Sequence, residues 1–318
     1  MIDAKQGYDL IGDIHGHAND LIELLKELDY ENSEGFYKHT ERKVIFLGDF
    51  IDRGVNQKRV LDIVMPMVEA GTALAVMGNH EFNALAFHTS DPENPAAWLR
   101  KRDDKNISQH LAFLNDYSSP ELKNELNKVL SFFRSLPLWL EIEGIRVIHA
   151  CWHDDIIQSI CPMLNDDQTM TNDFFIAANR KDTIEYNAIE ILLKGLEFKL
   201  PNSISFFDKD GHERHEVRMR WWLNEAENLG ELAFGHYQKE ITEIPVNKDQ
   251  LIGYPDNAPP VFIGHYWLND DKPKPLAQNI ACIDYSVAKG KGGKLVAYRW
   301  NGETNLSVDN FIYVDHIK

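Results

Sequence analysis

Six side chains that could bind metal ions stand in or near short glycine-containing motifs of this 318-residue chain. The motifs are GDIHGH at 12–17, GDFIDRG at 48–54 and GNHE at 78–81, followed by a lone histidine at 149 and GH at 264–265. They offer carboxylate, amide and imidazole donors without a thiolate, namely Asp13, His15, Asp49, Asn79, His149 and His265. This mixture of donors suits Mn²⁺, Fe or Zn²⁺ better than a soft metal bound by thiolates.

A set of six such ligands predicts two divalent metal ions. One carboxylate can bridge two ions about 3.5–4 Å apart, the usual separation in two-metal hydrolytic sites. We expect Asp49 to be that bridge. The chain has 33 Lys and Arg against 50 Asp and Glu, a net charge of −17. An anionic phosphate substrate would need a local reversal of this field, which bound cations supply. Mn²⁺ is favoured, with Fe or Zn²⁺ as the alternatives.

The elements that must position these ligands alternate between strands and helices. Apolar runs at Tyr8–Ile11, Lys43–Leu47 and Thr72–Met77 each end in a glycine followed by a metal-capable side chain, and amphipathic helical stretches lie between them. This βαβαβ pattern predicts a mostly parallel sheet with helices on its faces, in which ligands bind beyond the carboxyl ends of the strands. The glycine before each ligand is expected to permit a sharp turn.

The rest of the chain predicts helices over 82–133, a hairpin at 139–150 and three further strands. Those strands are expected at Val261–Gly264, Ile280–Tyr285 and Lys294–Trp300. Residues 152–258 are less regular, with one helical stretch at Tyr186–Phe198. We interpret them as a cap or insert within a single domain of residues 1–318.

Composition disfavours several classes of protein. With 43% apolar residues the chain can bury a sizeable core. Its net charge of −17 disfavours general binding to nucleic acids or anionic membranes. No apolar run reaches membrane-spanning length, the strand expected at 8–11 leaves no room for a signal peptide, and the three cysteines form no disulfide-like framework. We expect a reduced, cytoplasmic chain.

The motifs D-x-H, GD-x-x-DRG, GNHE, H and GH, in this order, resemble those of the calcineurin-like metallophosphoesterases. The branches that look most similar are the phosphoprotein phosphatases and the symmetric diadenosine tetraphosphatases. The resemblance covers roughly 7–150 and 260–300, and implies a layered α/β fold of mixed sheets flanked by helices, here with a partly helical cap. It also implies that Asp13, His15 and Asp49 hold the first metal, and that Asp49, Asn79, His149 and His265 hold the second.

The same resemblance implies roles for residues that do not bind metal. His80 would protonate the leaving oxygen, Asp52 would orient His80, and Arg53 would bind phosphate oxygens. A bidentate guanidinium suits a phosphate, and a histidine paired with a carboxylate suits proton donation near neutral pH. The phosphoprotein phosphatases also use a second arginine from the later half of the chain. Arg218 and Arg220 are candidates and Arg220 is favoured, unless both are surface or stacking residues.

The leading prediction is a metal-dependent phosphatase that hydrolyses phosphate monoesters through a bridging hydroxide. Its substrate would be a phosphoprotein or a small monoester. The alternative is a symmetric diadenosine tetraphosphatase-like enzyme acting on a dinucleoside polyphosphate. The segments at 282–285 and 292–295 resemble the bacterial diadenosine type, although Tyr285 replaces its usual threonine. The Asp52-Arg53 pair and Glu81 favour the phosphatases instead.

Two further classes are disfavoured. A non-catalytic binding module should have lost ligands or the acid, yet all six ligands and His80 are present. A nuclease on this fold is disfavoured by the acidic charge and by the sequence Gly264-His265-Tyr266-Trp267, which lacks the second histidine of GHxH.

Some aromatic and histidine side chains leave alternatives open. The aromatic residues at 221, 222, 266 and 267 could line the cleft or pack in the core, and the 152–258 segment is predicted to select substrates. His17 is expected in the first turn of a helix, or else in support of the metal ligands. Surface positions are expected for the histidines outside the motifs, which are His88, His110, His153, His212 and His215.

Overall fold

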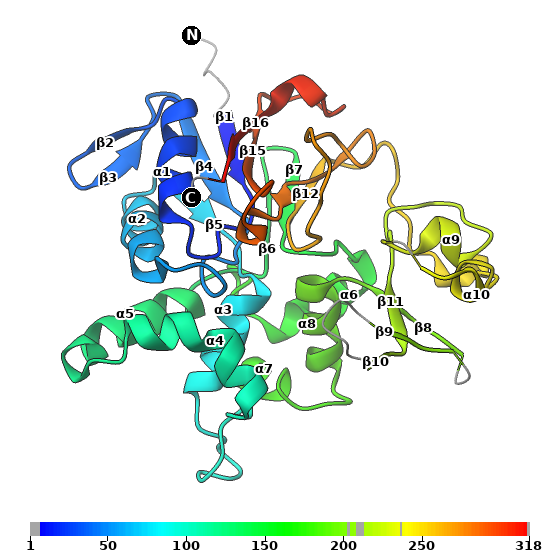
Figure 1. The fold of residues 1–318 in the computed structure, drawn as a ribbon, viewed down its shortest axis with the longest axis horizontal. Coiled ribbons are helices and arrows are strands. Elements are labelled where there is room, and N and C mark those ends of the chain that lie inside the picture. The colour runs from blue at the N-terminus through cyan, green and yellow to red at the C-terminus, as the bar shows by residue number, and fades with distance from the viewer. Residues whose placement is uncertain (1–6, 202–203, 208–212, 236, 317–318) are drawn as a thin grey trace.

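Two β-sheets form the centre of the computed structural model, which describes residues 7–201, 204–207, 213–235 and 237–316 (Figure 1). Within these residues the larger sheet has six strands, in the order β14-β15-β1-β4-β5 with β16 beside β15. The first three predicted strands are parallel neighbours in it, whereas β15 runs antiparallel to β1. The strands of this sheet are β1 (Gly7–Ile11), β4 (Arg42–Phe46), β5 (Ala73–Ala75), β14 (Asp284–Tyr285), β15 (Lys294–Trp300) and β16 (Phe311–Asp315).

The smaller sheet has four strands in the described part of the chain, in the order β13-β12-β7-β6. β12 is parallel to both of its neighbours, while β6 and β7 form the predicted hairpin. The single strand predicted at 280–285 is interrupted at Ile283, because β13 pairs in the smaller sheet and β14 in the larger one. The strands are β6 (Trp139–Ile142), β7 (Ile145–Ile148), β12 (Val261–Ile263) and β13 (Ile280–Cys282).

Amphipathic helices pack on the larger sheet through their apolar stripes. α1 (Ala18–Glu27) packs on β15 and β16 through fully buried leucines such as Leu21 and Leu24, and α2 (Gln57–Glu69) packs on β5. The predicted helical region follows as α3 (Asn79–His88), α4 (Asp104–Asp116) and α5 (Lys123–Arg134). A short hairpin of β2 (Glu31–Ser33) and β3 (Phe36–Lys38) lies beside α2 (Figure 1).

The 152–258 segment consists of two parts with different cores. Its helices α6, α7 and α8 contribute residues such as Phe175 and Leu192 to the main hydrophobic core. Residues from about 196 to 251 instead surround a separate small cluster that includes Val217 and Leu232, and β8, β11, α9 and α10 lie together at one side of the molecule (Figure 1). The elements are α6 (Asp154–Ile160), α7 (Asn172–Ala177), α8 (Ile184–Lys194), β8 (Glu197–Lys199), β9 (Phe206–Phe207), β10 (Glu213–Arg214), β11 (Glu216–Arg218), α9 (Leu229–Leu232) and α10 (Lys239–Thr242).

The predicted α/β class with mixed sheets and flanking helices is therefore confirmed. All three cysteines are free, with Cys151 and Cys282 buried. No helix in the described ranges is both long enough and apolar enough to cross a bilayer.

Candidate metal centre and active site

The predicted metal ligands come together where strands of both sheets end. Asp13 follows β1, Asp49 follows β4 and Asn79 follows β5, while His149 and His265 follow β7 and β12 of the smaller sheet. The two sheets therefore present their carboxyl ends to one site. His265 donates its backbone N–H to the carboxylate of Asp13, with N–O distances of 3.1 and 3.3 Å, which ties the sheets together there.

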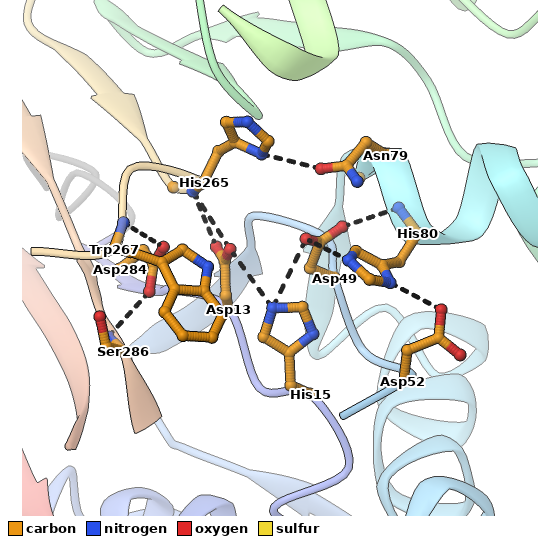
Figure 2. Close-up of polar contacts among 12 residues, drawn as sticks. Asp13, His15, Asp49, Asp52, Asn79, His80, His265, Trp267, Asp284 and Ser286 are labelled. Carbon is orange, nitrogen blue, oxygen red and sulfur yellow. Dashed lines mark hydrogen bonds and ion pairs between the residues drawn. The ribbon is translucent and has the colours of Figure 1, made fainter. Parts of the chain in front are cut away.

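Asp49 occupies the centre of this group (Figure 2). Its Oδ2 atom lies 3.6 Å from His15 Nε2 and 3.4 Å from His149 Nε2. Asn79 Oδ1 lies 3.2 Å from His149 Nε2 and 2.8 Å from His265 Nδ1. Two ligand atoms that are each about 2.1 Å from one ion are roughly 3–4 Å apart. These separations match those around bound metal ions, with Asp49 between the two groups of ligands.

The hydrogen bonds of the histidines test whether this site fits cations. His15 Nδ1 donates to Ile51 O at 2.9 Å and His149 Nδ1 donates to Leu47 O at 2.7 Å, because a carbonyl oxygen can only accept. In a neutral ring each Nε2 then presents a lone pair, and these lone pairs face carboxylate and amide oxygens. His15 Nε2 is buried without a hydrogen-bond partner. A proton or a metal ion between these atoms would satisfy them, and the donor set of imidazole, carboxylate and amide groups fits a metal centre.

Electrostatics lead to the same conclusion. Burial raises the pKa of Asp13 well above its usual value, and the nearby Asp284 adds to this. Burial would also raise the pKa of Asp49, yet the charges of His149 and His80 hold it well below the usual range. Burial lowers the pKa of His149, but Asp49 outweighs this and raises it to about 10. The carboxylates therefore draw positive charge into the site, and a metal ion can supply it.

The backbone around the site is strained at several predicted functional residues. His15, Asp49, Asp52, Arg53 and His265 all have φ between 47° and 70°, in the left-handed region. Non-glycine residues rarely adopt this region, and such strain concentrates at functional sites. The sequence pattern gave no indication of these conformations.

The glycines before the ligands serve two different purposes. Gly48 has φ +88° and makes the turn that was predicted. Gly264 does not have a positive φ, but a Cβ there would lie 2.1 Å from Asp13 Oδ1. At Gly264 the requirement is close approach of the backbone to a ligand, which the turn hypothesis did not anticipate.

The proposed acid is held by a hydrogen-bonded chain. His80 Nδ1 donates to Asp52 Oδ2 at 2.6 Å, and His80 Nε2 lies 3.9 Å from Asp49 Oδ2 (Figure 2). Burial lowers the pKa of His80, but the charges of Asp49 and Asp52 outweigh this and raise it above its usual value. His110 donates to the other oxygen of Asp52 at 2.7 Å.

His110 is only 5% exposed, so the prediction that it lies at the surface is wrong. His212, which was also predicted at the surface, lies outside the described residues.

Glu81 is a second buried residue whose role the sequence pattern did not reveal. Its carboxylate accepts hydrogen bonds from the backbone N–H groups of Asp49, Phe50 and Gly78 at 2.7, 2.9 and 3.1 Å. It thereby fastens the loop after β4 to the loop after β5. Its presence in the GNHE motif was the only available signal.

A cleft of about 840 Å³ lies over the centre, and three arginines are among the residues that line it. Residues of the proposed centre and residues of α4 also line this cleft. The three arginines are Arg53, Arg214 and Arg218. The guanidinium of Arg53 stacks on Trp267 at 4.1 Å from the ring centroid. Arg53, Arg214 and Arg218 are called the cleft arginines below.

Two sequence expectations change at this cleft. Arg220 is not among the residues that line it, so the second phosphate-binding role passes from Arg220 to Arg218 as a proposal. Trp221 and Trp222 are 1% and 5% exposed, and Trp221 donates to Ala150 O at 3.0 Å. They pack in the core, while Trp267 is the tryptophan at the cleft.

Comparison with known proteins gives a family and several relatives. A sequence model of the calcineurin-like phosphoesterases matches residues 9–236. The bis(5'-nucleosyl)-tetraphosphatase PrpE (asymmetrical) of Oceanobacillus iheyensis is 29% identical over 143 residues, which cover 45% of this chain and 54% of that protein. The protein of the same name from Halalkalibacterium halodurans is 42% identical over 74 residues, covering 23% and 30%. The chain thus spans about half or less of the length of these relatives.

One solved structure illustrates how widely the fold is shared. The cold-active protein tyrosine phosphatase of a psychrophilic Shewanella has a TM-score of 0.50 to this chain at 17% identity, over 95% of this chain and 80% of that one. At this identity the similarity concerns the fold alone.

Proposed function

Because the chain belongs to the calcineurin-like phosphoesterase family, we propose that it hydrolyses phosphate esters at a centre of two divalent cations. Mn²⁺ is the favoured metal, with Fe or Zn²⁺ as alternatives. One observation carries the proposal: His149 Nδ1 is bonded to Leu47 O, and the opposite nitrogen, Nε2, faces both Asp49 Oδ2 and Asn79 Oδ1 within 3.4 Å. Asp13, His15 and Asp49 would hold one ion, and Asp49, Asn79, His149 and His265 the other.

Bound cations would supply a water of lowered pKa as the nucleophile and would neutralise charge on the phosphate. The residues of the chain do the remaining work. Arg53, oriented by Trp267, would bind phosphate oxygens through its guanidinium. His80 would donate the proton on its Nε2 to the departing oxygen, while Asp52 holds the ring by its other nitrogen.

The first candidate substrate is a phosphate monoester, either on a protein or on a small molecule. The generic centre and the open cleft of about 840 Å³ support it, because such a cleft admits an extended chain or a small ester. Trp221 and Trp222 are buried, so we do not expect them to contact the substrate.

The second candidate is a dinucleoside polyphosphate. The three cleft arginines favour it, because they offer cationic groups for more than one phosphate along the same cleft. The relatives named above carry the word tetraphosphatase, but with the qualifier asymmetrical rather than the symmetric type that the sequence motifs resemble. The residues of the 152–258 segment that would select substrates are then Arg214 and Arg218.

One parallel assay separates these candidates. The purified chain, loaded with Mn²⁺, is offered p-nitrophenyl phosphate, a phosphopeptide and diadenosine tetraphosphate, and the nucleotide products are identified. ADP alone indicates symmetric cleavage, whereas ATP with AMP indicates asymmetric cleavage. His149→Gln serves as the inactive control, and Arg220→Gln as a control outside the cleft. Elemental analysis should give two Mn²⁺ per chain. Saturation at one ion with normal turnover would refute the two-metal centre.

A further inference from the structure

We propose that His17, Asp20 and His316 form a separate metal site that takes one Zn²⁺ ion and joins the start of α1 to the end of β16. None of the three belongs to the six ligands at the strand ends. His17 is the last residue of the GDIHGH motif and precedes α1, Asp20 lies in the first turn of α1, and His316 follows β16. The proposed function uses none of them.

The donor atoms already have the separation of metal ligands. Asp20 Oδ2 lies 3.3 Å from His17 Nδ1 and 3.0 Å from His316 Nδ1. Two ligands at about 2.0–2.1 Å from a tetrahedral Zn²⁺ ion are roughly 3.3 Å apart. All three donor atoms lie within 4.8 Å of one another. Little movement of these side chains is needed to admit an ion between them.

The chemistry of the cluster suits Zn²⁺ in particular. Two imidazoles and one carboxylate are a common set of protein ligands for zinc sites that keep one position open. The Asp20 side chain is 2% exposed, whereas those of His17 and His316 are 14% and 16% exposed. The carboxylate is thus largely withdrawn from solvent, and the two rings, 4.8 Å apart between centroids, stand edge to face beside it.

The cluster also opens on a space for a fourth ligand. A cavity of about 290 Å³ is lined by His17, Asp20 and His316 together with Asn19 and Asn56. It is large enough for several water molecules, one of which could complete a tetrahedral ion. Arg53 lines this cavity as well as the catalytic cleft, so the two spaces share one lining residue.

A metal at this site would act mainly on stability. Asp20 and His316 are 296 positions apart in the sequence, so the ion would close a loop of nearly the whole chain. An ion that binds the folded chain but not the unfolded chain stabilises the folded state, and so raises the temperature of unfolding. The plain alternative is an Asp20 carboxylate that accepts a hydrogen bond from His316 without any metal.

The test counts ions and measures thermal stability. The full chain and its His316→Gln, Asp20→Asn and His39→Gln variants are equilibrated with buffered Zn²⁺ and analysed for zinc content. His39 belongs to neither cluster, so His39→Gln is the matched control. We expect His316→Gln and Asp20→Asn to hold one ion fewer than the wild type and His39→Gln to hold the same number. At 100-fold excess over its Kd, Zn²⁺ bound here should raise the Tm by about 4 °C more in wild type than in His316→Gln.

The same measurement in a variant without the catalytic centre distinguishes zinc bound at this site from zinc bound at that centre. The Asp49→Asn/His149→Gln double variant removes ligands of the proposed two-metal centre, and should still bind one Zn²⁺ that His316→Gln abolishes. His17→Gln gives the same comparison if His316→Gln is poorly folded by circular dichroism. Equal zinc content and equal thermal shift in wild type and both variants would overturn the proposal. Because the readout is a difference of one ion, a wrong count at the catalytic centre would not disturb it.

Discussion

His110 donates a hydrogen bond of 2.7 Å to Asp52 from the side opposite to His80. The two histidines thus bind different oxygens of one carboxylate, and Asp52 is 3% exposed. Although burial raises the pKa of Asp52, the hydrogen bonds from His110 and His80 outweigh it and lower the pKa to about 2. Asp52, which would orient the proposed acid His80, is therefore itself held in place by His110.

His110→Phe should lower kcat about tenfold and leave KM nearly unchanged. The reason is that His110 would act on the acid through Asp52 and does not line the cleft; loss of comparable supporting partners around metal ligands typically costs about 10–100-fold. His110→Gln, which keeps an N–H donor, should recover part of the loss. Steady-state kinetics with a monoester substrate measures both parameters. Equal kcat for the Phe variant and wild type would show that Asp52 is held without His110.

His80→Ala should lower turnover by about 10²–10⁴-fold while the bound metal content stays constant. The side chain is assigned to the leaving oxygen, and its closest ring contact is with Asp52 rather than with a metal ligand. A leaving group of low pKa, such as p-nitrophenol, needs less protonation and should suffer a smaller loss than an alkyl ester. The comparison requires kinetics on both esters and elemental analysis of each preparation. Loss of metal in this variant would contradict the assignment.

The fold was largely predictable, and so was the meeting of the proposed ligands at the strand ends, because both depend on local patterns. Apolar runs ending in Gly-Asp or Gly-Asn fixed the positions of β1, β4 and β5, and their parallel order follows from the helices between them. The division of 280–285 between two sheets could not be predicted. It depends on which neighbours each half pairs with, and one apolar run carries no such information.

The supporting residues of the site escaped prediction for a similar reason. His110 lies 58 positions from Asp52 and belongs to no motif, so only the packing of α4 reveals their contact. Arg218 and Arg220 are two positions apart in a segment of short strands and turns, and the sequence could not tell which one faces the cleft. From the sequence, Trp221 and Trp222 could equally have lined the cleft or packed in the core. The structure shows that both are buried in the core.

Glu81→Gln should destabilise the chain and weaken metal binding together. The carboxylate oxygens accept three backbone hydrogen bonds, and an amide nitrogen at either position would face a donor. An unmet buried donor costs about 1–3 kcal/mol, which corresponds to a fall of roughly 2–5 °C in Tm for a chain of this size. Thermal unfolding and metal titration measure the two effects. Glu69→Gln, on an exposed position of α2, is the control and should behave as wild type.

His88→Gln should reduce the loss of stability in mild acid. Burial lowers the pKa of His88 to about 4, with the charge of His110 adding to this effect. Since the folded pKa lies below the unfolded value of about 6.5, the unfolded chain binds more protons between these values, and stability falls as the pH drops from 6.5 toward 4. The difference in Tm between pH 7 and pH 5 should be smaller in His88→Gln than in wild type. An unchanged difference would mean that His88 is not a source of acid sensitivity.

Arg218→Gln should discriminate between the two candidate substrates. Arg218 lines the cleft beside His265, and its guanidinium lies 5.4 Å from the ring centroid of Tyr266. If the substrate is a dinucleoside polyphosphate, its further phosphates would extend along the cleft toward Arg214 and Arg218, whereas a monoester has no further phosphate for them to bind. Loss of one charge-assisted hydrogen bond of about 1.5–3 kcal/mol should raise the KM for diadenosine tetraphosphate at least about tenfold. The KM for p-nitrophenyl phosphate should change much less.

Arg220→Gln is the matched control for this measurement, because it removes the same charge two positions away and does not line the cleft. Its KM values for both substrates should equal those of wild type. If Arg218→Gln raises both KM values by the same factor, Arg218 binds the reacting phosphate itself and the monoester candidate gains support. If Arg220→Gln has the larger effect, the assignment from the sequence was correct and the cleft arginines must be redefined. Only a selective loss on the polyphosphate agrees with an extended row of phosphate contacts along this cleft.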